Sequence, residues 1–155
     1  MGRMTERYSN IVVGVDGSAG AREALDAAAD IAGAFGSTLH VVMATHKISP
    51  SEYRHALAKL PEEFWNAIDF HADANCILDE AITRLEERGV RAKPHLCVEH
   101  PAEALIGVAE REQADLIVVG SRGLGIAQRA FLGSVSSKMA HRAPCAVLIT
   151  GSRQC

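Results

Sequence analysis

Residues 116–135 read LIVVGSRGLGIAQRAFLGSV, an apolar run that leads directly into a glycine-rich stretch. The run 116–120 is short, continuously apolar and rich in β-branched residues, which is typical of a strand buried on both faces of a parallel sheet. Four glycines fall within fourteen residues: Gly120, Gly123, Gly125 and Gly133. Because glycine permits positive φ and close approach, backbone N–H groups can converge there on an anion. The stretch therefore predicts a phosphate-binding loop at the carboxyl end of a buried strand.

Outside this stretch, apolar runs alternate with segments of helical period. Further strands are expected at 11–16, 37–44, 90–98 and 145–150, and the alternating pattern of 90–98 indicates a half-exposed strand near a sheet edge. Helices are expected at 19–35, 64–88 and 101–112, and a last short helix is expected to start at Ser134 or Ser136 and to run through Met139. Their ends carry ordinary helix signals. Ser18 can cap the first helix and Gly36 follows it, Arg88 and Gly89 close the second, and Pro101 suits the first position of the third.

This alternation predicts an α/β fold with three layers, in which a five-stranded parallel sheet carries helices on both faces in a Rossmann-like arrangement. The 155 residues suit a single domain, 1–155, with a flexible N-terminus at 1–9. Residues 45–62 have no clean period and are expected to form a long connecting loop with at most a short helical turn. Ligands of such folds bind beyond the carboxyl ends of the strands, so Asp16 and Gly120 are expected to face the binding crevice.

Composition and charge narrow the class of function. The chain is 48% hydrophobic and 23% charged, with a net charge of -3 and no basic cluster, which argues against nucleic acid or an anionic membrane as partner. No run approaches the roughly 20 apolar residues of a membrane helix, and residues 1–10 lack the apolar core of a secretory signal. The four cysteines form no C-x-x-C pair. We therefore expect a cytoplasmic protein with no nucleic-acid and no membrane partner.

Two common phosphate loops do not fit the glycine stretch. The Walker A pattern G-x-x-x-x-G-K-S/T, begun at Gly120, meets Ile126 and Ala127 where Lys and Ser or Thr are required. The dinucleotide pattern G-x-G-x-x-G, begun at Gly123, fails at Gln128, and it belongs after the first strand of a fold. The chain therefore lacks the lysine with which a P-loop neutralises phosphate charge.

A second anion site is expected where the last helix begins. The free N–H groups of a helix N-terminus carry about half a positive charge. Two groups of backbone donors would then flank the nine residues between Gly123 and Gly133, a separation that suits a polyphosphate. Side chains that could add hydroxyl donors or positive charge are Ser121, Ser134, Ser136, Arg122 and Arg129.

The spacing Gly120-x-x-Gly123, nine residues, Gly133-Ser134 resembles the G-2x-G-9x-G-S/T motif of the universal stress protein family, in its ATP-binding branch. The likeness covers nearly the whole chain, through IVVGVDGS, PAEALIGVAE, ADLIVVGSRGLG and FLGSVSSKMAHRAPCAVLI in that order. It implies a fold of the adenine nucleotide alpha hydrolase-like type and a homodimer paired through the strand 145–150. It also implies ATP, or ADP, AMP or cyclic AMP, as ligand, with Mg²⁺ as a companion ion.

The resemblance further implies a set of nucleotide-binding residues: Gly14, Val15, Asp16, Ala44, Gly120, Ser121, Arg122, Gly123, Gly125, Gly133, Ser134, Val135 and Ser136. Asp16 would hold the ribose or support the metal, and backbone groups of Ala44 would meet the adenine. Residues 120–125 would wrap the ribose and phosphates, and the N–H groups of 133–135 would donate to the phosphates. Two positions depart from the family pattern, Ala146 where Pro is frequent and Glu99 or His100 where Gly is frequent.

Simpler interpretations of several residues stay open. Asp16 can be an Asp-Gly-Ser turn residue that caps a helix, and glycines can serve tight turns alone. The seven histidines show no spacing typical of a metal site, and His95, His100 and His141 are predicted to be surface or turn residues. Phe64 and Trp65 open an amphipathic stretch and are predicted to be core residues.

Three functions are consistent with these patterns. The first is an ATP-binding stress-response protein that reports adenylate state through its conformation or its dimer. The second is a slow ATPase or phosphotransferase, which would need an oriented water, a base and charge neutralisation at the γ-phosphate. The third is a family member that prefers cyclic AMP. Because no P-loop lysine and no base are evident, we favour a regulatory binding protein and leave enzymatic activity uncertain.

Overall fold

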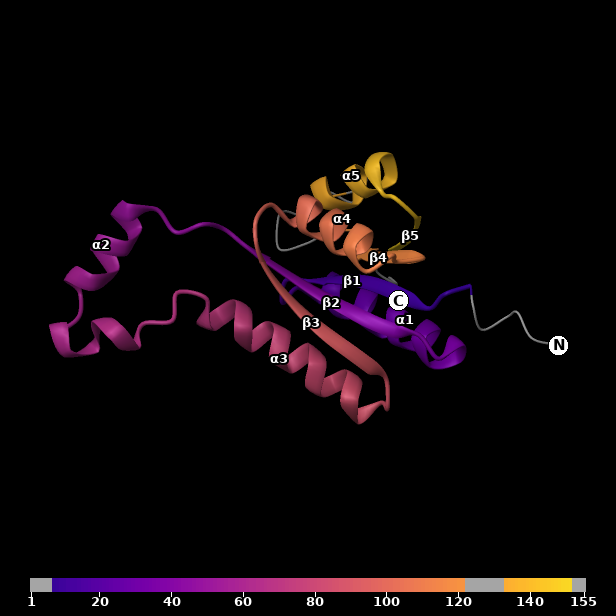
Figure 1. The fold of residues 1–155 in the computed structure, drawn as a ribbon, viewed down its shortest axis with the longest axis horizontal. Helices are drawn as coiled ribbons and strands as arrows, with labels where there is room; N and C mark the ends of the chain where they lie inside the picture. Colours follow the sequence, from indigo (N-terminus) through magenta and orange to yellow (C-terminus); the bar gives the residue numbers. More distant parts are fainter. Residues whose placement is uncertain (1–6, 122–132, 152–155) are drawn as a thin grey trace.

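Five parallel strands form one sheet, in the order β3-β2-β1-β4-β5, in the computed structural model, which describes residues 7–121 and 133–151 (Figure 1). The strands are β1 (Asn10–Val15), β2 (Thr38–Thr45), β3 (Arg91–Val98), β4 (Leu116–Gly120) and β5 (Ala146–Thr150). Every neighbouring pair is parallel. The predicted fold class is therefore confirmed, with strand boundaries that differ from the expected ones by at most one residue.

The central strand β1 and its neighbour β4 are deeply buried. In β1, Ile11, Val12 and Val13 have no exposed surface, and in β4 the same holds for Ile117 and Val118. These residues are buried because helices cover both faces of the sheet. The continuous apolar runs read from the sequence correspond to this double burial.

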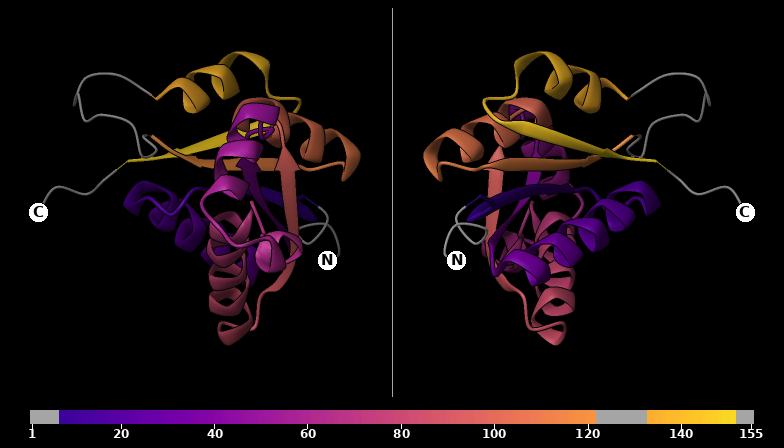
Figure 2. Two further views of the ribbon diagram at one scale, coloured as in Figure 1. Left: turned by 90° about the vertical axis from the view of Figure 1, so that its left-hand side faces the viewer. Right: turned by 90° about the vertical axis from the view of Figure 1, so that its right-hand side faces the viewer.

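Helices pack in two layers on the sheet (Figures 1 and 2). The helices α1 (Ala19–Phe35) and α3 (Ala72–Glu87) share one core with the odd-numbered side chains of β1. The helices α4 (Pro101–Arg111) and α5 (Ser134–Arg142) share the other core with Val12, Val42 and Val119. An ion pair between Arg142 and Glu103, with its shorter contact at 2.5 Å, holds the end of α5 beside the start of α4.

The helix α1 begins and ends at the capping residues that the sequence predicts. The Ser18 hydroxyl accepts a hydrogen bond from the Ala21 N–H at 3.1 Å, which caps the helix. Gly36 ends it with a left-handed φ of 70°, and its N–H donates to the Ala32 carbonyl. These caps fix where the chain leaves β1 and enters β2, and so they position the loop at the end of β1.

The connection after β2 differs from the expectation. Instead of a loop with at most one helical turn, it contains α2 (Pro50–Ala58), whose N-cap Ser49 and Glu52 form a capping box. The predicted long helix from residue 64 is divided, because residues 62–67 form the 3-10 helix η1 (Glu62–Ala67) and α3 starts only at Ala72. The helices α2 and η1 project away from the sheet, at the left of Figure 1.

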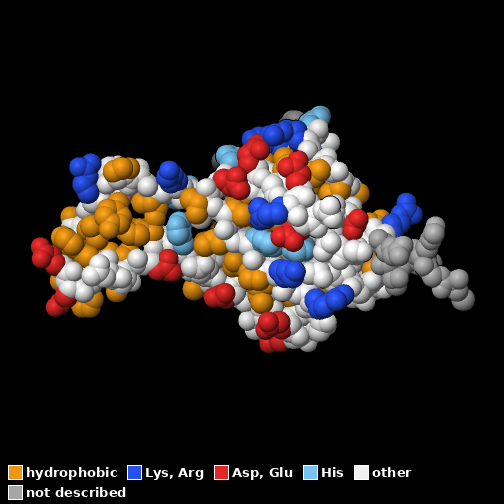
Figure 3. Space-filling model, in the orientation of Figure 1, with side chains coloured by type: hydrophobic (Ala, Val, Ile, Leu, Met, Phe, Trp, Pro, Cys, Tyr) orange, Lys and Arg blue, Asp and Glu red, His pale blue; other side chains and the backbone are white. Residues whose placement is uncertain are grey.

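Phe64 and Trp65 are therefore not core residues, and the prediction was wrong. Their side chains are 51% and 39% exposed, and neither α2 nor η1 has a buried residue. Figure 3 shows apolar side chains gathered on this projection. The indole N–H of Trp65 donates to the carbonyls of Leu57 and Leu60, both at 3.1 Å, so the ring ties η1 to α2 and does not reach the sheet.

His95 also differs from the expectation of a surface or turn residue. It lies within β3, is only partly exposed, and contacts His40 of the neighbouring strand with 3.0 Å between the His40 Nδ1 and His95 Nε2 atoms. His100 and His141 are exposed, as predicted.

Strand order reverses beside β1. The chain moves from β1 to β2 to β3 on one side, and then returns to place β4 and β5 on the other side. The carboxyl ends of β1 and β4 thus border the point where ligands bind in open α/β sheets. β3 and β5 form the two edges of the sheet. Among the described residues, no helix combines the length and apolar character needed to cross a membrane.

Candidate functional site

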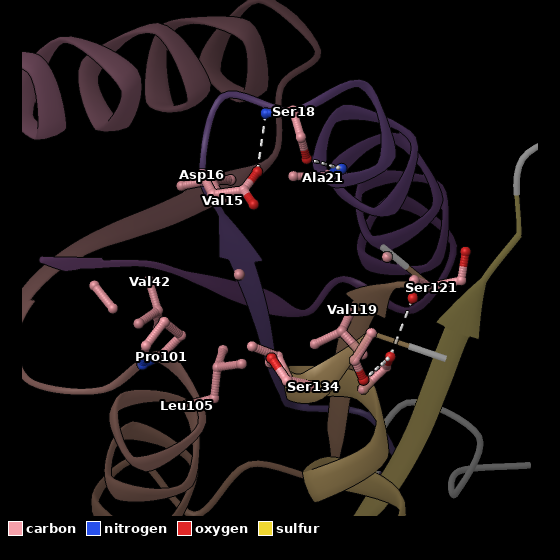
Figure 4. Close-up of a pocket in the computed structure, with 16 residues that line it drawn as sticks. Val15, Asp16, Ser18, Ala21, Val42, Pro101, Leu105, Val119, Ser121 and Ser134 are labelled. Atoms are coloured by element: carbon pink, nitrogen blue, oxygen red, sulfur yellow. Dashed lines mark hydrogen bonds between the residues drawn. The ribbon is translucent and has the colours of Figure 1, made fainter. Parts of the chain in front are cut away.

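A cavity of about 290 Å³ opens at the carboxyl ends of β1, β2 and β4 (Figure 4). Its size is close to the lower end of the roughly 300–1,000 Å³ of small-molecule sites. The residues that line it are Gly14, Val15, Asp16, Ser18, Ala21, Val42, Ala44, Pro101, Leu105, Val119, Gly120, Ser121, Gly133, Ser134, Val135 and Ser136. They come from both sides of the point where strand order reverses, so the cavity occupies the position that the fold predicts for a ligand.

Asp16 begins the turn between β1 and α1. Its Oδ1 atom accepts a hydrogen bond from the Ser18 N–H at 2.9 Å, which makes an Asx turn, and Gly17 follows with a positive φ of 80°. Asp16 therefore has the local structural role that the simpler interpretation gave it. Within the described chain, its second carboxylate oxygen accepts no hydrogen bond, so this atom remains able to meet a ligand.

Gly120 is required by close packing at the end of β4. A Cβ atom at this position would lie 2.8 Å from the carbonyl oxygen of Gly20 and 2.9 Å from its carbonyl carbon. Both distances are far below van der Waals contact, and backbone atoms cannot move aside as a side chain can. The first glycine of the motif therefore lets β4 pass the first turn of α1, whatever else it does for a ligand.

Ser136 closes the base of the glycine-rich segment. Ser136 is 1% exposed, and its hydroxyl lies 3.2 Å from the Ser121 carbonyl and 3.0 Å from the Gly133 carbonyl, to either of which it can donate. The Gly133 N–H donates to the Ser121 carbonyl at 2.7 Å. The two ends of the segment are thus joined, and the Gly133 N–H, which was expected to face phosphate, is already used within the protein.

The donors that face the cavity are the next ones along the chain. Ser134 and Val135 are the first two residues of α5, and the first N–H groups of a helix have no acceptor within that helix. Gly133 is the N-cap, and within the described residues no side chain caps α5. Since Ser134 and Val135 line the cavity, their N–H groups and the helix dipole favour an anion there, and we refer to them as the anion-binding corner.

The wall beside β2 is apolar. Val42, Ala44, Pro101 and Leu105 line it, and the Leu105 side chain packs over Gly14, where a Cβ would lie 3.3 Å from Leu105 Cδ2. Figure 4 shows Val42, Pro101 and Leu105 on one side of the cavity, with Asp16 and Ser134 across from one another. An apolar wall opposite backbone donors suits a flat ring system joined to an anionic group.

Charge is scarce at this site. Of the cavity-lining residues in the described part of the chain, Asp16 alone carries a formal charge. Among these lining residues, backbone N–H groups are therefore the donors that could meet an anion.

All the predicted site residues that the structure describes line this single cavity: Gly14, Val15, Asp16, Ala44, Gly120, Ser121, Gly133, Ser134, Val135 and Ser136. Arg122, Gly123 and Gly125, together with Arg129, lie outside the described residues. Their roles as ligands of a nucleotide stay predictions.

Some lining residues were not foreseen: Ser18, Ala21, Val42, Pro101, Leu105 and Val119. For two of them, the sequence contained a feature from which their place in the cavity could have been predicted. Val42 precedes Ala44 by two positions in a strand and so shares its face, and Pro101 starts the helix that follows β3. The sequence contained no such feature for Leu105, because only the packing of α4 against Gly14 brings this residue to the site.

Comparison with known proteins agrees with the motif. The model of the Universal stress protein family matches residues 7–151. The chain belongs to the universal stress protein family. Its members with similar sequences include universal stress protein Rv1636 of Mycobacterium tuberculosis H37Rv, 34% identical over 143 residues, which are 92% of this chain and 95% of that protein. Universal stress protein YxiE of Bacillus subtilis is 33% identical over 151 residues, covering 92% of this chain and 98% of the relative.

Among solved structures, a universal stress protein in complex with cAMP superposes with a TM-score of 0.69 and 31% sequence identity. The match covers 93% of this chain and 97% of that one. The five-stranded α/β fold is therefore that of the family, and at least one similar member binds an adenine nucleotide.

Proposed function

We propose that this protein binds an adenine nucleotide, with ATP as the principal ligand, in the cavity at the carboxyl ends of β1 and β4. The observation that carries the proposal is the anion-binding corner of Ser134 and Val135 placed opposite the apolar wall of Val42 and Leu105. A nucleotide has the matching shape, because an apolar base and an anionic phosphate chain are joined by a sugar. The similar protein solved with cAMP supports the same class of ligand.

The nucleotide would lie with its base toward β2. Backbone groups at Ala44 would meet the adenine edge, and the phosphates would reach the N-terminus of α5. There the N–H groups of Ser134 and Val135 would donate, assisted by the segment that starts at Gly120. Asp16, at the end of β1, would then face the ribose or a Mg²⁺ ion that accompanies the phosphates.

These two roles for Asp16 can be separated with the Asp16→Asn variant. The amide keeps an oxygen that can accept from the Ser18 N–H, so the turn is preserved while the charge is removed. If Asp16 supports Mg²⁺, affinity for ATP should fall about ten-fold or more in the presence of Mg²⁺ and little without it. If it holds the ribose, affinity for ATP and for adenosine should fall alike. Unchanged affinity under all conditions would remove Asp16 from the site.

Binding constants for ATP, ADP, AMP and cyclic AMP, measured by calorimetry with and without Mg²⁺, test the proposal directly. We expect saturable binding of ATP at one site per chain and weaker binding of AMP, because AMP lacks the phosphates that would reach α5. Tighter binding of cyclic AMP than of ATP would assign the protein to the second candidate function, which the similar cAMP complex favours. No binding of any of the four nucleotides would contradict the proposal.

We propose a regulatory role and not rapid catalysis. Charge neutralisation at a γ-phosphate usually needs a lysine, an arginine or a metal ion, and none of the described lining residues is basic. Phosphate release from ATP over several hours, with and without Mg²⁺, measures any slow turnover. The free thiols Cys76, Cys97 and Cys145 fit a reducing compartment, and we propose the cytoplasm.

A further inference from the structure

A second group of metal-ligating side chains lies on the α4 face of the sheet, closer to the amino ends of the strands than the cavity is. It consists of His40 in β2, His95 in β3 and Glu112, which follows α4 directly. His40 is 1% exposed, and His95 and Glu112 are partly exposed. Figure 3 shows histidine side chains at the middle of one face of the molecule, beside acidic and basic groups.

The hydrogen-bond partners of His40 indicate which of its two ring nitrogens carries the proton and which has a free lone pair. Its Nε2 lies 3.1 Å from the Asn10 amide oxygen, which can only accept, so Nε2 carries the proton. The Nδ1 atom is then an acceptor, and it faces His95 Nε2 at 3.0 Å. Metal-binding histidines are commonly oriented in this way, with one nitrogen donating to an oxygen and the other directed at the ion.

The distances suit a tetrahedral ion. Two nitrogen ligands at about 2.0–2.1 Å from Zn²⁺ lie roughly 3.3 Å from one another. The separation of 3.0 Å between His40 Nδ1 and His95 Nε2 needs only a small opening to reach that value. His40, His95 and Glu112 each offer one ligand atom within 4.8 Å of those of the other two, and the Glu112 side chain lies at the end of a helix, where it can turn toward the histidines.

Burial and nearby charges both act on the two histidines. Burial lowers the pKa of His40 and of His95, against the opposing effect of Glu112. Lys93 and Arg111 are the nearby cations, and the Glu112 carboxylate offsets them.

We propose that His40, His95 and Glu112 form a binding site for a divalent transition metal ion, with Zn²⁺ as the representative ion. His40 binds through Nδ1, His95 through Nε2 and Glu112 through its carboxylate, and a water fills the fourth position. On binding, the His95 proton moves from Nε2 to Nδ1, so the ring stays neutral. The ion links β2, β3 and the end of α4, and its binding does not require a nucleotide.

Zn²⁺ binding by the full-length, nucleotide-free and metal-stripped protein tests this proposal. Calorimetry should show one ion per chain, and the Tm should rise when Zn²⁺ is added. The variants are His95→Ala and Glu112→Gln, and His55→Ala is the control because His55 is exposed on α2, outside the cluster. We expect the affinity to fall about 100-fold in His95→Ala and about 10-fold in Glu112→Gln, and to stay unchanged in His55→Ala.

Absorption bands of Co²⁺ substituted for Zn²⁺ report the coordination directly and should indicate a tetrahedral site in the unmodified protein. Absence of Zn²⁺ binding up to about 100 μM, or equal binding by all three variants, would overturn the proposal. Glu112→Gln alters only a partly exposed side chain at a helix end, so it gives an answer even if His95→Ala fails to fold.

Discussion

Gly120 illustrates how one residue can serve both packing and binding. Its position follows from β4 running past the first turn of α1, where the Gly20 carbonyl leaves no room for a side chain. The same contact places Ser121, the next residue, at the cavity. A glycine motif in a binding loop can thus be needed for the fold as much as for the ligand, and a substitution there tests both.

The Gly120→Ala variant should lose about 1–3 kcal/mol of unfolding free energy, because the added methyl group meets backbone atoms that cannot yield. Urea unfolding followed by circular dichroism measures this loss. Gly33→Ala is the matched control, since Gly33 lies within α1 and a Cβ added there would have no described atom within 4 Å beyond its own helix backbone. That control should gain up to about 1 kcal/mol through helix propensity. Equal stability of the two variants would show that Gly120 is not tightly packed.

At the scale of elements, the sequence predicts those strands and helix ends whose structure depends on residues close by in the chain. The β-branched runs of β1 and β4, the Ser18 cap and the Gly36 end of α1 were all foreseen, because period and capping act over a few residues. The extent of α3 and the exposure of Phe64 were not, because an apolar residue on a helical period predicts a buried face without saying what covers it. Here Phe64 stays 51% exposed among the described residues.

The same reasoning explains why the contact between His40 and His95 was not predicted from the sequence. His40 and His95 are 55 residues apart in sequence, and only the pairing of β2 with β3 brings them together. The candidate nucleotide site was easier to predict, because its residues sit at strand ends and within one spaced motif. Only the packing contacts of that site, such as Leu105, needed the structure.

The helix α2 depends on its cap to an unusual degree, since it has no buried residue. Hydrogen bonds from Ser49 lower the pKa of Glu52, which marks an intact capping box. Ser49→Ala should destabilise α2 by about 1 kcal/mol, and so speed amide exchange within the helix roughly five-fold. The global unfolding midpoint should not change, because the sheet does not rest on α2. Hydrogen exchange measured residue by residue checks this, and unchanged exchange in α2 would contradict it.

At the scale of the whole molecule, β5 leaves one edge of the sheet unpaired within the described chain. Open strand edges favour pairing with another chain, and we propose a homodimer through Ala146–Thr150. Sedimentation at micromolar concentration should then give about 33 kDa, twice the 16.5 kDa of one chain. Exchange of the β5 amides should accelerate on dilution. A 16.5 kDa species at these concentrations would rule out this dimer.

The account as a whole rests on phosphate being held by backbone N–H groups at the start of α5. Ser134 is the first residue of α5, a position where proline is tolerated, and the extended Gly133 before it (φ -62°, ψ 165°) is compatible with a following proline. Ser134→Pro therefore removes one N–H while leaving the helix intact. Ser134→Ala removes the hydroxyl alone and serves as its control.

Calorimetric affinities for ATP of the unmodified protein and these two variants test the central claim most directly. A hydrogen bond to a charged group contributes about 1.5–3 kcal/mol, so Ser134→Pro should bind ATP about 10- to 100-fold more weakly than Ser134→Ala does. Circular dichroism should show that both variants remain folded. Equal ATP affinity of the folded proline and alanine variants would contradict the account.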